Sequence, residues 1–144
     1  MPNTTPAPWH LKVVGVLSLL WSALGGIDYI MTRLHSSAYL SQLGDPAAIL
    51  AWIDRMPPWV HVAWPVGVWG AVLGSILLLA RSRSAVWVFL ISLVGAVANT
   101  AYQWTAPVTQ FTHGGSMLLM LVICLVAALL WLYSRRMAAR GVLG

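Results

Sequence analysis

The chain has 144 residues, of which 60% are hydrophobic and only 8% are charged. Soluble domains usually carry about 25% charged residues, so the composition excludes an ordinary soluble domain and indicates a membrane protein of one domain. Eight Lys and Arg stand against three Asp and Glu, but the cations lie at the ends of apolar runs, which argues against nucleic-acid binding. We therefore expect the lipid bilayer to be a partner of this protein.

Four apolar runs are each long enough to cross a bilayer, which takes about 20 residues of helix. They are Leu11–Met31, Trp59–Ala80, Ala85–Thr105 and Gly114–Tyr133. The turn Arg81–Ser84 is so short that the second and third runs must be antiparallel neighbours. The sequence thus predicts an all-α fold, in which a bundle of four transmembrane helices forms a single domain over residues 1–144.

The first run is about 20 residues long, whereas the apolar core of a signal peptide has about 7–15, so we expect a retained transmembrane helix. Asp28 lies within this run. A carboxylate at the centre of a membrane helix costs about 2.5–3.5 kcal/mol on insertion scales, and less near the interface. Asp28 also lies toward the C-terminal end of its helix, where the macrodipole disfavours negative charge. The side chain needs compensation, which makes Asp28 a candidate site residue.

The first loop, Thr32–Pro58, is predicted to contain a short amphipathic helix. Asp45-Pro46 is a helix cap followed by proline at the first helical position, and Pro57-Pro58 ends the segment. One side of the helix carries the large apolar residues Ile49, Leu50, Trp52, Ile53 and Met56. We expect it to lie on the outer membrane face, either as a connector that avoids water or as a lid over a site.

The cations orient the bundle, because cytoplasmic loops of membrane proteins carry an excess of Lys and Arg. One side has Lys12, Arg81, Arg83, Arg135, Arg136 and Arg140, and the other has Arg33 and Arg55. We therefore expect both termini to be cytoplasmic in a bacterial inner membrane, with the first loop and the connection Ala106–His113 outside. This bias argues against an exporter that inserts in both orientations.

In that orientation, polar residues of all four spans gather near the outer ends of the helices. The candidate pocket residues are Asp28, Tyr29, Thr32, His61, Asn99, Tyr102, Gln103 and His113. Helical spacing adds two stripes of small and polar residues. One stripe is formed by Ser18, Trp21, Gly25, Asp28, Thr32 and His35, and the other by Ser92, Gly95, Asn99 and Tyr102. Such stripes face the interior of a membrane bundle, where small residues let helices approach and polar ones hydrogen-bond.

The second span adds two backbone features. Gly70 and Gly74 form a Gly-x-x-x-Gly pattern, which predicts a close approach to a neighbouring helix. Pro65 cannot donate a backbone hydrogen bond, so the carbonyl of His61 is left free near the outer end.

Two interpretations of the polar residues remain open. They could form a hydrogen-bonded layer that fixes helix pairing, with Asp28 reaching toward the headgroups or pairing with Arg33. Alternatively they line an outward-facing pocket in which Asp28 carries a proton or binds a cation. His61 and His113 would then hydrogen-bond or titrate, since histidine titrates near neutral pH.

No motif of established catalytic chemistry is present. The chain has no Gly-x-Ser-x-Gly, no His-Glu-x-x-His and no phosphate-binding glycine loop, so we expect no enzyme. The stripe His113, Met117, Met120, Cys124 has ligand types that suit Cu(I), but Met and Cys are also ordinary gap-fillers. His61 and His113 lie too close to the span edges to hold a haem well, so we expect no haem, copper or other cofactor.

One stretch resembles a known family. This stretch reads Leu19-Leu20-Trp21-Ser22-Ala23-Leu24-Gly25-Gly26-Ile27-Asp28-Tyr29-Ile30-Met31-Thr32. It is similar to the first-helix signature of small four-span bacterial inner-membrane proteins. The later helices of that family resemble the following residues of this chain: Pro58-Trp59, Val68-Trp69-Gly70, Gly74, Leu78-Leu79 to Arg81-Ser82-Arg83, Phe89 and Ser92-Leu93. The likeness covers about residues 11–105, with Ser22 where the family has asparagine. It implies a four-helix membrane protein of a group loosely labelled sugar transporter-like.

These observations favour a protein that binds or transports a small solute, with proton coupling through Asp28. A chain of this size is a poor conduit alone, so we expect a homo-oligomer if it transports. The alternative is a non-catalytic accessory or scaffold subunit of a larger membrane complex, in which the polar layer only organises helices.

Overall fold

A computed structural model describes residues 5–105 and 116–144 of the chain. It contains the helices α1 (Trp9–Arg33), α2 (Ser37–Leu43), α3 (Pro46–Asp54), α4 (Pro58–Leu79), α5 (Ala85–Thr105) and α6 (Ser116–Ala139). Four of them, α1, α4, α5 and α6, are long and apolar enough to cross a membrane. The prediction of an all-α bundle of four spans is confirmed, and the chain has the helices of a multi-pass membrane protein.

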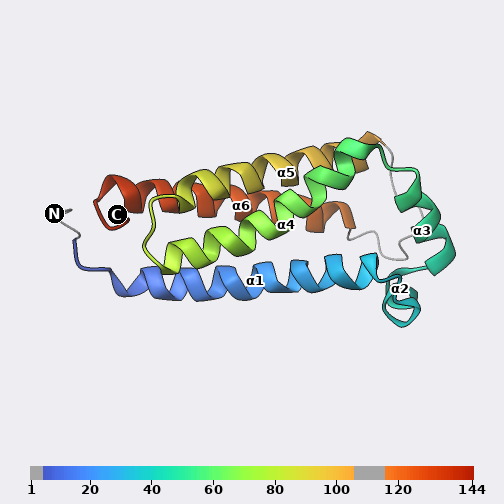
Figure 1. Ribbon diagram of the computed structural model, residues 1–144, viewed down its shortest axis with the longest axis horizontal. Coiled ribbons are helices and arrows are strands. Elements are labelled where there is room, and N and C mark those ends of the chain that lie inside the picture. Colours follow the sequence, from blue (N-terminus) through green and yellow to red (C-terminus); the bar gives the residue numbers. More distant parts are fainter. Residues whose placement is uncertain (1–4, 106–115) are drawn as a thin grey trace.

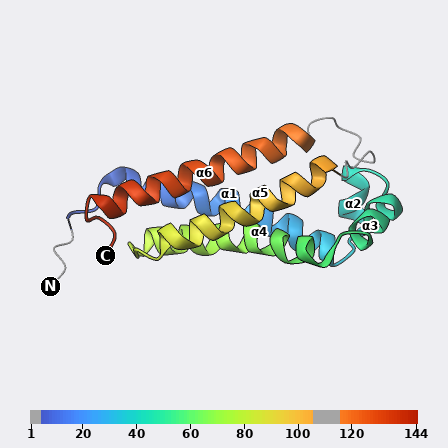
Figure 2. The same ribbon diagram turned by 90° about the horizontal axis from the view of Figure 1, so that it is seen from above.

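The four long helices pack in chain order, α1 against α4, α4 against α5 and α5 against α6. Both termini and the α4–α5 turn lie at one end of the bundle, here named the terminal end (Figure 1). The short helices α2 and α3 lie at the opposite end, here named the α2–α3 end. Figure 2 shows α6 diverging from α1 toward the α2–α3 end.

Glycines bring α4 and α5 into backbone contact, as the Gly-x-x-x-Gly pattern predicted. A Cβ atom added to Gly70 would lie 2.9 Å from Ser92 Cβ, and one added to Gly74 would lie 2.8 Å from the Phe89 ring. The closest approach to backbone atoms is at Gly95, where an added Cβ would lie 2.8 Å from Ala63 O and from Gly67 N. The Ser92 hydroxyl fixes the same contact, because it donates to Gly67 O at 2.6 Å.

The terminal end is tied together by segments far apart in sequence. Arg81 Nη2 donates to Thr5 O at 2.6 Å, and Arg81 Nε donates to Val142 O at 3.1 Å. His10 Nδ1 and the Tyr133 hydroxyl lie 2.5 Å apart and connect α1 to α6. Below them is an apolar cluster of buried residues from all four long helices and the C-terminal segment: Leu11, Leu78, Ala85, Phe89, Leu130, Met137, Val142 and Leu143. This cluster closes the terminal end of the bundle.

The first loop holds two short helices, of which the sequence predicted one. α3 begins after Asp45, whose carboxylate accepts a hydrogen bond from Ala47 N at 3.3 Å, as predicted. Its apolar side does not spread along the membrane face. It packs instead against α2 and the start of α4, in a second buried cluster of Leu40, Ile49, Ile53, Met56 and Val60. The short helices therefore cover the α2–α3 end of the bundle (Figure 1).

Candidate functional site

Two adjoining cavities lie between the two buried clusters. The first, the bundle cavity, has a volume of about 410 Å³ and runs from Asp28 toward Leu130 near the terminal end. The second, the cap cavity, has a volume of about 440 Å³ and lies beneath α2 and α3. Both are lined by Asp28, Leu43, Trp64, Asn99, Leu119, Met120 and Ile123. Their volumes fall in the range of small-molecule sites, about 300–1,000 Å³.

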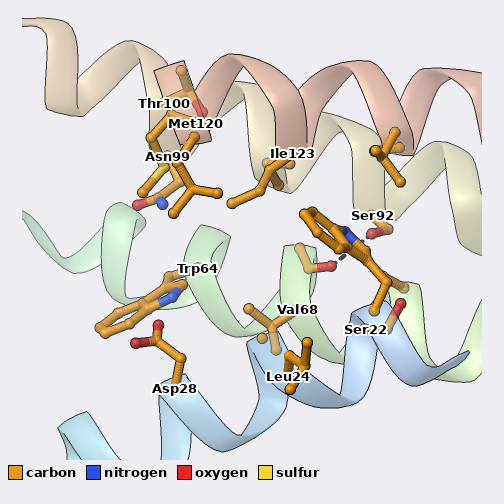
Figure 3. A pocket seen from close by; sticks show the side chains of 18 of the residues that line it. Ser22, Leu24, Asp28, Trp64, Val68, Ser92, Asn99, Thr100, Met120 and Ile123 are labelled. Atoms are coloured by element: carbon orange, nitrogen blue, oxygen red, sulfur yellow. Dashed lines mark hydrogen bonds between the residues drawn. The ribbon is translucent and has the colours of Figure 1, made fainter. Parts of the chain in front are cut away.

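Asp28 lies where the two cavities meet. Figure 3 shows its carboxylate beside the indole of Trp64, with Asn99, Met120 and Ile123 on the opposite wall. The Tyr39 hydroxyl donates a hydrogen bond of 2.5 Å to Asp28 Oδ1. This hydrogen bond offsets part of the cost of placing a carboxylate in a membrane helix. It also links α1 to the cap that α2 forms.

The beginning of α2 positions Tyr39. Ser36 caps this helix, and its hydroxyl accepts a hydrogen bond from Tyr39 N at 3.4 Å. Burial, the hydrogen bond to Asp28 and the charge of Asp28 together raise the pKa of Tyr39 from 10.0 to about 12. The hydroxyl therefore stays protonated, and stays a donor to Asp28, at a pH that ionises ordinary tyrosines.

We expect the Tyr39 phenol to ionise later than a free tyrosine in an alkaline titration. Between pH 10 and about 12 the folded state keeps a proton that the unfolded state has lost, so rising pH destabilises the fold in this window. Asp28→Asn removes the charge and should bring the ionisation to lower pH, while burial still keeps it above the ordinary value. Absorbance of tyrosinate, compared among wild type, Asp28→Asn and Tyr39→Phe, measures this. An unchanged titration in Tyr39→Phe would contradict the assignment.

Two polar atoms in the lining residues are buried and unpaired. Ser22 Oγ and Asn99 Oδ1 have no hydrogen-bond partner among the described residues. By contrast, the buried hydroxyls of Ser18 and Ser75 donate to backbone carbonyls of their own helices. A buried polar atom without a partner costs about 1–3 kcal/mol, so each of these two atoms destabilises the fold in this arrangement.

Three further predicted residues lie at or near the cavities. Thr32 and Gln103 line the cap cavity, and Gln103 Nε2 donates to Met120 Sδ at 3.7 Å. Tyr102 lies beside this cavity and packs its ring against Trp52 and Trp59. Together with Asp28 and Asn99, these residues line or border the two cavities.

Other predicted residues lie elsewhere. Tyr29 faces α4 and packs edge-on against Trp64 and Trp69, with ring centroids 5.0 and 6.2 Å apart. His61 Nδ1 lies 3.2 Å from Arg33 Nη2, and neither residue lines a cavity. His113 lies outside the described residues.

The alternative in which Asp28 pairs with Arg33 is not what the structure shows. The Arg33 guanidinium lies over the rings of Tyr29 and Trp64, 5.5 and 5.9 Å from their centroids, and contacts His61. Cation–π contacts hold it on the α4 side of α1, whereas Asp28 turns to Tyr39. Asp28 and Arg33 thus have different partners and do not pair with each other.

Sequence reasoning missed Tyr39 and Trp64. Trp64 stands in an apolar run, where tryptophan carries no positional signal of its own. Tyr39 lies in a segment of the first loop for which no helix is predicted, although Ser36 is a good helix cap and indicates α2. Within residues 5–105 and 116–144, no three His, Cys, Asp or Glu side chains gather as metal ligands. Cys124 Sγ instead contacts Thr100 Oγ1 at 3.3 Å.

Comparison of the chain with protein-family models, with curated proteins and with solved structures gave no match. The site is therefore interpreted from the residues of this chain alone. Those residues define a cavity within a membrane bundle that is mainly apolar, contains one carboxylate with a tyrosine donor, and includes two unpaired polar atoms.

Proposed function

We propose that this protein binds a small solute in the cavity beside Asp28 and carries it across a bacterial inner membrane. The observation on which the proposal rests is the placement of the Asp28 carboxylate at the junction of two cavities, held there by Tyr39. A hydrogen-bonded layer that served helix pairing alone would satisfy its polar atoms within the bundle. Here Asn99 Oδ1, on the facing wall, is buried and has no partner among the described residues.

The closure of the bundle supports a direction of access. The terminal end is closed by the cluster around Phe89 and by the Arg81 hydrogen bonds, and it carries six cations at the predicted cytoplasmic ends of the helices. Under the positive-inside rule, the cavity then lies toward the extracytoplasmic side. In this proposal α2 and α3 are a lid, because Leu40, Ile49 and Met56 line the cap cavity from above.

Asp28 is the proposed charge carrier. It exchanges a proton with the solute or with water, and Tyr39 stabilises the charged form by donating a hydrogen bond. The resemblance of residues 11–105 to small four-span inner-membrane proteins agrees with a multi-pass membrane protein. We propose that copies of the chain associate, because one chain of this size makes a poor conduit alone.

The test is a thermal-shift screen of the purified protein against neutral sugars, amines, amino acids and organic acids, at mildly acidic and mildly alkaline pH. A ligand at about 100 times its Kd adds about 2.7 kcal/mol to the folded state, so we expect one class to raise Tm by several degrees. We expect Asp28→Asn to abolish the shift and its pH dependence. The folded state should survive, because an asparagine oxygen still accepts from Tyr39.

The matched control is Asp54→Asn, which removes an exposed acid on α3 away from both cavities. It should leave the response of the wild type unchanged. If no class shifts the wild type, the proposal is wrong. If Asp28→Asn lowers stability and the protein purifies with other subunits, the accessory-subunit alternative is favoured instead.

A further inference from the structure

The lining of the bundle cavity is specific in its chemistry. Asp28 is the carboxylate of the lining, and no Lys, Arg or His stands among the lining residues that the structure describes. Trp64 lies beside Asp28 (Figure 3), Tyr39 donates a hydrogen bond to it, and Trp21 lines the same cavity seven residues earlier on α1, a helix rise of roughly 10 Å at 1.5 Å per residue. A carboxylate beside aromatic faces suits an ammonium ion, which gains both charge pairing and cation–π contact.

The rest of the cavity is apolar and elongated. On α6, lining residues run from Leu119 to Leu130, a helix rise of roughly 16 Å at 1.5 Å per residue. Leu24, Val68 and Ala71 supply the facing walls. A hydrated ion or a sugar would leave most of this surface unmatched, whereas an alkyl or aryl body would cover it.

The bundle cavity also opens sideways. Three of its lining residues have exposed side chains, Trp21 by 38%, Leu24 by 65% and Leu119 by 50%. They lie on α1 and α6, which are not among the packed helix pairs of the described chain and which diverge away from the His10–Tyr133 contact (Figure 2). Trp21 lies near the middle of α1, a helix long and apolar enough to span a membrane, so this opening comes to the depth of the acyl chains when α1 crosses a bilayer.

We infer that the ligand is a lipophilic organic ammonium ion, which enters from the bilayer between α1 and α6. Its ammonium group binds between Asp28 and the aromatic rings, and its apolar body lies along the α6 wall toward Leu130. This inference rests on the proposed function and names the substrate class of the same site. The ammonium could belong to a free amine or to an aminophospholipid headgroup, which share this chemistry.

Gly25 supplies a variant that blocks the cavity without disturbing the helix contacts. It lines the bundle cavity, and a Cβ added to it meets no atom within 4 Å. Gly25→Leu therefore places its side chain in the path of the ligand body. We expect it to fold at least as well as wild type, because it fills space and replaces a flexible residue in a helix.

The experiment titrates octyltrimethylammonium into nanodiscs of phosphatidylglycerol that contain the wild-type protein, and follows the fluorescence of the cavity tryptophans. Tetramethylammonium lacks the apolar body, octyl sulfate reverses the charge, and empty nanodiscs correct for partitioning into lipid. We expect octyltrimethylammonium to bind saturably. Tetramethylammonium and octyl sulfate should each bind more weakly by about tenfold or more. We also expect about tenfold or greater loss in Asp28→Asn and in Gly25→Leu.

Saturable binding that both variants retain would overturn the inference, and so would equal binding of octyl sulfate. If a water-soluble solute shifts Tm but octyltrimethylammonium does not bind, the inference fails and the proposed function stands. Nanodiscs that contain phosphatidylethanolamine distinguish an aminophospholipid headgroup from a free amine as the source of the ammonium group. Competition by that lipid identifies a headgroup as the occupant, and undiminished binding identifies a free amine.

Discussion

Gly95→Ala should strongly destabilise the fold of the purified protein. The new methyl group would lie 2.8 Å from both Ala63 O and Gly67 N, two backbone atoms of α4 that cannot rotate away. The two helices would have to separate, which breaks the Ser92–Gly67 hydrogen bond and the packing of Phe89 on Gly74. We expect a loss of about 3 kcal/mol or more in the free energy of unfolding, the upper range for an overpacked core.

The matched control is Gly25→Ala on α1. This glycine also stands within a membrane helix, but its added Cβ meets nothing within 4 Å. The change should be neutral or stabilise the fold by roughly 0.5–1 kcal/mol, because alanine loses less conformational entropy in a helix. Equilibrium unfolding in mixed micelles, followed by circular dichroism, measures both variants. Equal stability of Gly95→Ala and wild type would show that α4 and α5 are not in backbone contact.

The fold was predictable because its signals are local and strong. Each span is a continuous apolar run of the length that a bilayer requires, and Asp45-Pro46 marks the start of α3. The helix ends were less certain. α6 continues to Ala139, beyond the predicted end at Tyr133, because Met137 packs into the terminal cluster. Such packing depends on residues from other helices, which a single run does not reveal.

The candidate site was predictable in part. Helical spacing and depth indicated Asp28 and Asn99, because both stand out as polar residues in apolar helices. The depth of a residue in the membrane does not tell which face of its helix it lies on. Tyr29 and His61 are therefore grouped with Asp28 and Asn99 by sequence, although Tyr29 and His61 face Arg33 and the α4 rings. The partner of Asp28 came from a short helix outside the spans, where no apolar run guides prediction.

The chain also offers a direct probe of whether the cavity is an accessible space. Gly25 lines it, and Ile27, two residues further along α1, is 51% exposed on the outer surface and lines neither cavity. The two positions differ little in depth but face different surroundings. A cysteine thiol reacts as the thiolate, which forms where water reaches it and is suppressed among acyl chains.

The decisive measurement is therefore the labelling rate of Gly25→Cys and Ile27→Cys in a Cys124→Ser background, with a trimethylammonium methanethiosulfonate in intact membranes. The Cys124→Ser change keeps a partner for Thr100. The account predicts labelling of Gly25→Cys at least about tenfold faster than Ile27→Cys, and slower labelling when octyltrimethylammonium is present. No labelling of Gly25→Cys, or equal rates at both positions, would mean that lipid or protein fills the space beside Asp28, and would contradict the account.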